Sequence, residues 1–246
     1  MPRTIRHALA LIIPFLLGAC ATAPITTETK DTSKTFKTVV VDAGHGGKDL
    51  GASRRYGGSE KNATLDVARR LEEKLRESQL KIVMTRSSDE FISLEKRVEV
   101  QNAQKNSIFV SIHFNDARRR GVHGYETYYN SPQARELAQH IQEKLMTIPH
   151  SANRGVKPGR FHVLRFSNYP AVLVECGFLS NRREGGSARD SEYRELLADR
   201  IAEAIVEQRY GSGVYHASAQ AAGVKPPSEG PSNTGPGLAP STLRHD

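Results

Sequence analysis

Histidine and acidic residues lie where short apolar stretches of the chain end. One stretch ends in Asp42 and is followed by the glycine-rich turn that contains His45. A second ends in His113 and a third in Glu175, while Glu60 begins a segment with helical periodicity. Two imidazoles and one carboxylate form a catalytic zinc site that keeps a fourth position open for water. A further acid beside the metal can then act as general base toward that water.

Each of these residues also has an ordinary structural explanation when it is taken alone. A histidine at the end of a strand is often a hydrogen-bonded core residue, and Glu175 could pair with a base. The turn 44–47 lacks the Lys-Ser/Thr of a phosphate-binding loop, and Glu60 could complement the dipole of its helix. Burying several titratable groups together is costly unless a metal or a reaction needs them, so their convergence favours a zinc centre.

Apolar periodicity divides the middle of the chain into alternating strands and helices. The expected strands are residues 38–42, 81–85, 108–113, 124–130, 161–164 and 171–175. The expected helices are residues 60–78, 93–105 with Ser93 as N-cap, 132–146 and 191–209. This alternation predicts an α/β fold: a single domain with a central, mostly parallel sheet of about six strands, covered by helices on both faces. In such sheets, sites form beyond the carboxyl ends of the strands, where the histidines and acids of this chain fall.

The beginning of the chain has the features of a targeting segment. Residues 1–19 hold two arginines and then an apolar stretch that is too short for the roughly 20 residues that span a bilayer. The stretch ends in Leu-Gly-Ala-Cys20, which resembles a bacterial lipobox. We expect a lipoprotein signal peptide over residues 1–19 and a lipid anchor on Cys20, with an ordinary secretory peptide as the alternative. Because Ala21 stands where an aspartate would signal inner-membrane retention, we expect anchoring in the outer membrane, facing the periplasm.

Polar segments without periodicity flank the middle of the chain. We expect residues 20–36 to be a lipidated cysteine followed by a flexible tether, and residues 211–246 to be a disordered tail rich in proline and glycine. This leaves residues 37–210 as the catalytic domain. The formal net charge of +8 favours anionic partners. We expect no nucleic acid among them, since no stripe of lysine and arginine with interleaved aromatic residues occurs.

Three segments that contain these residues closely resemble the zinc-dependent N-acetylmuramoyl-L-alanine amidases. They are Val-Val-Val-Asp42-Ala-Gly-His45-Gly-Gly-Lys-Asp49, Ser111-Ile-His113-Phe-Asn115 and Val172-Leu-Val-Glu175-Cys-Gly-Phe-Leu-Ser-Asn181. Two linking stretches share the resemblance, Ser93-Leu-Glu-Lys-Arg97-Val and Asn153-Arg-Gly-Val-Lys157. The similarity spans residues 37–210 in the family's order and spacing, and it does not include the anchor or the tail.

The resemblance implies both the reaction and the residues that perform it. The substrate would be peptidoglycan, cut at the amide bond between the muramic acid lactyl group and L-alanine. His45, Glu60 and His113 would bind one zinc ion, and Glu175 would be the catalytic acid/base.

Two further residues near the expected centre each have two open roles. Asp42 either orients His45 by accepting a hydrogen bond from its second nitrogen or caps the end of its strand. Asn115 either contacts substrate or caps a loop. Both remain candidates for supporting the metal site or the substrate.

Two other functions remain as alternatives at this point. A zinc peptidase acting within stem peptides would need the same metal ligands, and a non-catalytic peptidoglycan-binding lipoprotein would share the anchor. We further expect no obligatory activator protein. His113 and Glu175 are 62 positions apart, and the interval is filled by expected elements and short connections, which leaves no room for an added helix that could cover the metal.

Overall fold

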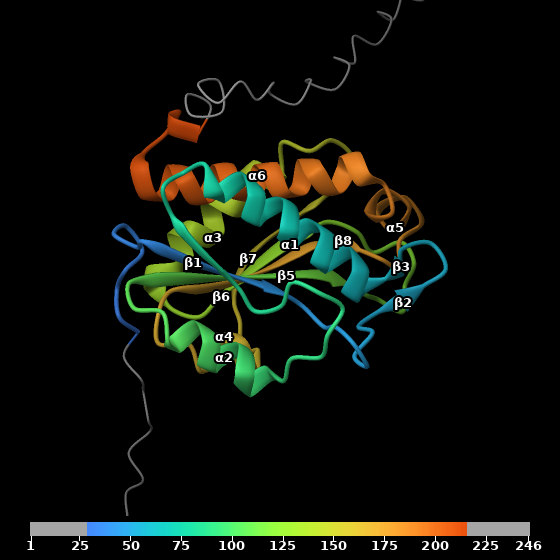
Figure 1. Cartoon of the computed structure of the whole chain (residues 1–246). Helices are drawn as coiled ribbons and strands as arrows, with labels where there is room; N and C mark the ends of the chain where they lie inside the picture. The colour runs from blue at the N-terminus through green and yellow to red at the C-terminus, as the bar shows by residue number, and fades with distance from the viewer. Residues whose placement is uncertain (1–28, 216–246) are drawn as a thin grey trace, which may run out of the picture.

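The computed structural model describes residues 29–215 of the 246-residue chain (Figure 1). Its strands are β1 (Thr38–Ala43), β2 (Ser53–Arg54), β3 (Gly58–Ser59), β4 (Lys81–Met84), β5 (Ser107–Asn115), β6 (Tyr125–Tyr129), β7 (Asn153–Pro158) and β8 (Ala171–Phe178). Its helices are α1 (Glu60–Arg76), α2 (Leu94–Asn102), α3 (Pro132–Leu145), α4 (His162–Arg165), α5 (Arg182–Ala188) and α6 (Ser191–Tyr210). Ser93 accepts a hydrogen bond from Lys96 N, which confirms it as the N-cap of α2.

Six of the strands form one sheet in the order β4-β1-β5-β8-β6-β7. The first four run parallel to one another, whereas β6 is antiparallel to β8 and β7 is parallel to β6. The predicted single α/β domain with a mostly parallel sheet of about six strands is therefore confirmed. The separate hairpin of β2 and β3 precedes α1.

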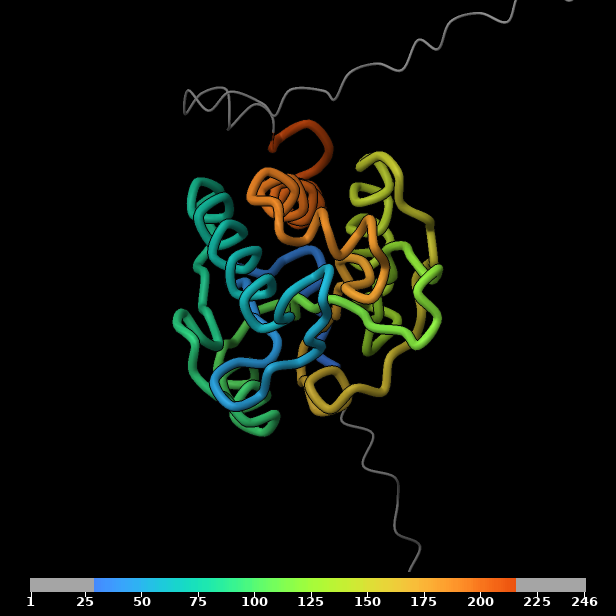
Figure 2. Tube along the Cα trace, turned by 90° about the vertical axis from the view of Figure 1, so that its right-hand side faces the viewer, coloured from blue at the N-terminus to red at the C-terminus, as the bar shows by residue number. Residues whose placement is uncertain are grey.

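Side chains alternate between the two faces of the sheet, as the pleat of a strand requires. The larger core holds Val39 and Val41 of β1 and Ile112 of β5, packed with residues of α1, α3 and α6. The smaller core holds Val40 and residues of β5 and β8, packed with α2 and α4. Figure 1 shows α1, α3 and α6 over one face and the shorter α2 and α4 over the other; viewed from the side (Figure 2), α6 lies between α1 and α3. Helices therefore cover both faces, as predicted.

One predicted strand is wrong. Residues 161–164 form most of the short helix α4, and the sixth strand is β7, Asn153–Pro158, which was not predicted. The sequence of β7, Asn-Arg-Gly-Val-Lys-Pro, has no apolar alternation because it lies at the edge of the sheet with little buried surface. Helix α5 was also missed, since its seven residues include two glycines.

The ordered domain is longer at both ends than the predicted range 37–210. Within the expected tether, Thr32 donates a hydrogen bond to Ser107 O, and Ser33 O accepts one from Gln208. Within the expected tail, Tyr215 is buried and donates to Asp199. The signal peptide, Cys20 and residues 216–246 lie outside the described residues. Between residues 29 and 215, no helix is long and apolar enough to cross a membrane.

Candidate metal and catalytic centre

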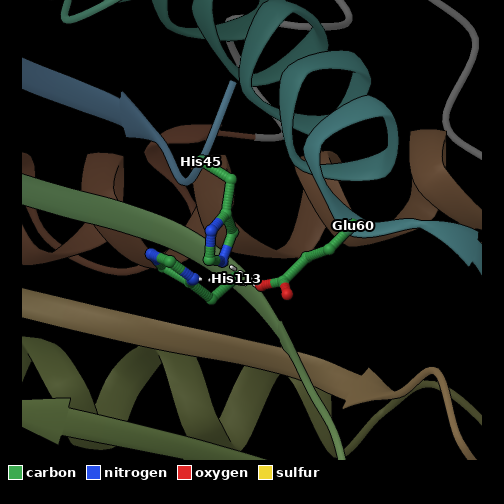
Figure 3. A group of neighbouring side chains, drawn as sticks. All are labelled: His45, Glu60 and His113. Carbon is green, nitrogen blue, oxygen red and sulfur yellow. Dashed lines mark hydrogen bonds and ion pairs between the residues drawn. The ribbon is translucent and has the colours of Figure 1, made fainter. Parts of the chain in front are cut away.

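Three of the predicted residues meet at the carboxyl-end rim of the parallel strands. His45 follows β1 by two residues, His113 lies near the end of β5, and Glu60 is the first residue of α1. One possible ligand atom from each residue lies within 4.8 Å of the other two. Figure 3 shows the three side chains pointing toward one another from the turn after β1, from β5 and from the start of α1. The structure therefore brings together the set that the resemblance implies.

The carboxylate of Glu60 is the centre of this group. Its Oε1 atom lies 3.0 Å from His45 Nε2 and 3.0 Å from His113 Nδ1. Burial alone would raise the pKa of Glu60, but the hydrogen bonds and charges of the two histidines outweigh burial and lower that pKa. Glu60 is therefore ionised, as a metal ligand must be. Backbone donors at Ala52 and Phe114 also hold the carboxylate in place.

The second nitrogen of His45 contacts Asp49, and this residue takes the role that we considered for Asp42. Nδ1 lies 2.9 Å from Asp49 Oδ2, which leaves Nε2 facing Glu60 and His113. Metal-bound imidazoles usually donate their other N–H in this way, since the hydrogen bond fixes the tautomer and the ring orientation. His45 has a φ of 62°, a left-handed backbone that is rare outside glycine and that turns the ring back toward the rim.

Asp42 does not contact His45, so its predicted role as the orienting acceptor is wrong. It is buried and accepts hydrogen bonds from Arg97, Thr85 and Ser111, each at 2.6 Å. Burial would raise the pKa of Asp42, but the charge of Arg97 and the two hydroxyl groups outweigh it, so the pKa is lowered. Arg97 also donates to the backbone oxygen of His45. Asp42 therefore holds Arg97 at the end of β1, and Arg97 in turn holds the turn that contains His45.

Two glycines make room for the histidine rings. A side-chain carbon on Gly44 would lie 2.4 Å from His113 Cε1, so the ring of His113 packs directly against the backbone of the turn. A carbon on Gly51 would lie 2.6 Å from Glu60 Oε2 and from His45 Cδ2. The glycine-rich sequence of the turn is therefore needed for close packing around the centre, and it is not a phosphate loop.

Glu175 lies beside this group on the neighbouring strand. In the register of β5 and β8 it is paired with His113, so the two side chains leave the same face of the sheet. Glu175 is buried, and its Oε2 atom has no hydrogen-bond partner within the described part of the chain. Burial raises the pKa of Glu175 to about 7. A carboxyl group with such a pKa can both take up and release a proton near neutral pH.

Asn115 faces the same cleft but is engaged by a neighbouring acid. Its Nδ2 atom donates to Glu126 Oε1 at 2.6 Å, and its Oδ1 atom accepts from Asp116 N. The register of β5 and β8 shifts between His113 and Asn115. A bulge of this kind re-aims the side chains that follow it. Both predicted roles of Asn115 are thus compatible with its position, since it caps a loop while lining the cleft.

A cleft of about 660 Å³ joins these residues to the surface. Its walls come from the turn after β1, the start of α2, the end of β5 and the start of α4. Phe91, Leu94 and Phe161 line it and are 41–51% exposed, which is unusual for large apolar side chains. An apolar cleft with a few convergent polar groups is the common form of a substrate site.

The donor set fits one zinc ion. It offers two imidazole nitrogens and one carboxylate, a set found in catalytic zinc sites that keep one position open. The orienting Asp49 and the unpartnered Oε2 of Glu175 both fit a centre that holds an ion and a reacting group. His45 and His113 remain 22% and 19% exposed, so solvent and substrate can reach the centre.

Comparison with known proteins agrees with this centre. The sequence model of the N-acetylmuramoyl-L-alanine amidases matches residues 39–207. N-acetylmuramoyl-L-alanine amidase LytC of Bacillus subtilis (strain 168) is 35% identical over 174 residues, which are 69% of this chain and 35% of LytC. The chain therefore matches about a third of LytC.

Two solved structures show the same fold. The catalytic domain of the amidase CwlV from Bacillus (Paenibacillus) polymyxa var. colistinus has a TM-score of 0.67 and 37% identity, covering 70% of this chain and 97% of that domain. The CwlD amidase of Clostridioides difficile, solved in complex with the GerS lipoprotein, has a TM-score of 0.66 and 32% identity, covering 70% of this chain and 98% of CwlD. The chain belongs to the N-acetylmuramoyl-L-alanine amidase family and is a hydrolase of the peptidoglycan amide bond between the muramic acid lactyl group and L-alanine.

Proposed function

We propose that this amidase is zinc-dependent, with one zinc ion held by His45 Nε2, His113 Nδ1 and the carboxylate of Glu60. The observation that supports this proposal most directly is the approach of both imidazole nitrogens to the same oxygen of Glu60. When bound, zinc would supply a Lewis acid for the lactyl carbonyl and lower the pKa of a nearby water molecule. The chain supplies the fixed ligand geometry and the second nitrogen contact at Asp49.

Glu175 is the proposed acid/base. It takes a proton from the attacking water while the new carbon–oxygen bond forms, and it passes that proton to the nitrogen of L-alanine as the carbon–nitrogen bond breaks. Its position supports this role, because it lies next to His113 in register and has a free buried oxygen. Glu126, another buried acid of this face, already accepts four hydrogen bonds.

The two alternative functions have no observation in their favour. A non-catalytic wall-binding protein would have no reason to keep the complete set of His45, Glu60, His113 and Glu175. A peptidase acting within stem peptides could use the same ligands, but the match to the amidases covers residues 39–207, most of the described domain. The amidase reaction is therefore favoured, and mass analysis of the reaction products tests it.

We also propose that residues 1–19 are a lipoprotein signal peptide and that Cys20 carries the lipid anchor, with the chain in the outer membrane facing the periplasm. The described chain enters β1 at the amino end of the parallel strands, whereas the centre lies at their carboxyl ends. An anchor at Cys20 would then attach to the domain on the side opposite the cleft.

Replacing Cys20 by serine should remove the anchor. The variant should stay in the aqueous phase during detergent phase separation, and mass analysis of its N-terminal peptide should show no lipid. The domain should still fold and cut soluble substrate. Cys176→Ser is the matched control, because this buried cysteine lies within β8, and it should keep the anchor. Lipid-free Cys20 in the wild type, with unchanged membrane partitioning, would show that the lipobox interpretation is wrong.

No activator protein is proposed for this enzyme, although CwlD was solved with a partner. Between β5 and β8 the chain holds two helices, α3 and α4. Helix α3 packs against β6 and α6, and α4 packs against α2 and β8. Both metal-binding histidines keep part of their surface open. The substrate path is therefore open without removal of any described segment.

The purified protein supplied only with zinc should release dye-labelled fragments from peptidoglycan. The expected reason is that the cleft is already formed, so a second protein has no segment between residues 29 and 215 to displace from it. A protein that binds one zinc ion with the predicted ligands but stays inert until a second protein is added would contradict this proposal.

A further inference from the structure

Two basic residues form a cluster on the catalytic face that the amidase reaction does not explain. Arg154 and Lys157 lie on β7, the edge strand next to β6. Both donate to Oε2 of the buried Glu126, Arg154 Nε at 3.2 Å and Lys157 Nζ at 2.6 Å. We define these three residues as the Glu126 cluster.

Strand register places the Glu126 cluster beside the acid/base. Glu126 is paired with Glu175 in the antiparallel ladder of β6 and β8, and Glu175 is paired with His113 in the ladder of β5 and β8. Residues paired in this way point to the same face of a sheet. The order across the sheet is therefore His113, Glu175, Glu126 and then the basic residues of β7. Since neighbouring strands are about 4.8 Å apart, β7 lies roughly 10 Å from Glu175.

The order of these residues across the sheet indicates on which side of Glu175 the leaving peptide lies. The group that protonates the L-alanine nitrogen must be on the leaving-group side of the metal ligands, and Glu175 is displaced from His113 toward β6 and β7. The stem peptide would therefore run from Glu175 across Glu126 toward β7. On the other side of Glu175, the exposed apolar side chains of Phe91 and Leu94 line the cleft and suit the uncharged faces of the sugar.

The Glu126 cluster carries a net positive charge that is open to solvent. Its two cations and one carboxylate sum to one positive charge. Burial would raise the pKa of Glu126, but Lys157 and Tyr128 outweigh it and lower the pKa, so the carboxylate is ionised. It is only 4% exposed, while the side chains of Arg154 and Lys157 are 35% and 42% exposed. Among the described residues, Arg154 uses only Nε for hydrogen bonding, and its guanidinium lies 5.0 Å from the centre of the Phe178 ring, so its Nη donors remain for a ligand.

We propose that Arg154 and Lys157, held in place by Glu126, bind the free carboxylate of the stem residue that follows L-alanine. This residue is a glutamate joined through its side-chain carboxyl group, so its α-carboxyl group is either free or amidated. Two residues of an extended chain span about 7 Å. The side chains of Arg154 and Lys157, which reach from β7 back to Glu126, cover the rest of the distance from Glu175. The pair would make the enzyme selective for the free acid. This inference rests on the amidase reaction and on the proposed role of Glu175.

The test compares two soluble muramoyl peptides that differ only in an α-carboxylate or an α-carboxamide on the second stem residue. Zinc-loaded wild type should cut the acid with a kcat/KM about ten-fold higher than the amide, as expected for charge-assisted hydrogen bonds. High salt should reduce this ratio by screening the partly exposed pair. Lys157→Met and Arg154→Met should each lower the ratio several-fold, mainly through KM for the acid.

Two control variants separate recognition from a structural role. Glu126→Gln removes the negative charge of the cluster and should keep or increase the preference for the acid. If the cluster were only structural, all three substitutions should reduce this preference to a similar extent. Arg135→Met, at an exposed position of α3, should leave the ratio unchanged. Equal wild-type rates for the two substrates, or a preference that survives both β7 substitutions, would overturn the proposal. Failure of the wild type to cut either substrate would contradict the amidase reaction itself.

Discussion

Removing zinc with a chelator should abolish activity, and adding zinc back should restore it. The reason is that the three ligands lie around one position and that no other group of the described chain can polarise the lactyl carbonyl in the same way. His45→Ala or His113→Ala should lower the bound zinc and the rate together. The loss should exceed a factor of about 10² in kcat, since both the electrophile and the activated water disappear.

The measurement is metal content by atomic spectroscopy alongside kcat on a soluble muropeptide. His123→Ala is the matched control, because this exposed histidine lies outside the centre and should keep both zinc and rate. The zinc affinity of the wild type should fall as the pH is lowered. Burial alone lowers the pKa of His45, but the contacts with Glu60 and Asp49 outweigh burial and raise it, so protons compete with the metal. Full activity in metal-free protein would refute the mechanism.

Glu175→Gln should keep zinc bound and lose at least a factor of about 10² in kcat, the usual effect of removing a positioned general base. The amide keeps the size of the side chain but cannot carry a proton between water and the leaving nitrogen. Glu60→Ala, in contrast, should lose the metal as well as the rate. If Glu175→Gln lost zinc and Glu60→Ala kept it, the roles of the two acids would be exchanged.

Metal-free Glu175→Gln should be more stable than the metal-free wild type. That result would show that the variant is folded and that its loss of activity has another cause. Burial raises the pKa of Glu175 from 4.5 to about 7 in the folded protein. Below pH 4.5 the carboxyl is neutral in both states and the two proteins should have similar stability. As the pH rises toward 7, the unfolded wild type ionises first, so its stability falls relative to Glu175→Gln. The difference in the free energy of unfolding should reach about 3 kcal/mol above pH 7, measured by urea denaturation.

The parallel part of the sheet and the convergence of His45, Glu60 and His113 could be predicted because the sequence carries the signal locally. Apolar stretches mark β1, β5 and β8, whose neighbours cover both of their faces. Parallel strands end at one rim, so His113 and Glu175 had to fall close together. The helical periodicity that starts at Glu60 placed its carboxylate at the same rim.

The supporting residues could not be predicted, because their positions depend on tertiary geometry. Asp49 orients His45 only because the backbone of the turn is left-handed at His45, and a pattern of residue types does not specify that angle. The sequence left two roles open for Asp42, and it is not the acceptor for His45 because the distant Arg97 occupies it. Glu126 gains its place from an antiparallel register between β6 and β8, and the edge strand beside it has no apolar pattern.

The most direct test of the account is mass analysis of products formed in water that contains a heavy isotope of oxygen. Purified, zinc-loaded protein should convert a defined muropeptide into a free stem peptide that begins at L-alanine and a muramic acid whose lactyl carboxylate has gained one heavy oxygen atom. That result would show water attacking the lactyl carbonyl. Shortened stem peptides with the heavy oxygen in a peptide carboxylate would instead show a peptidase and contradict the account.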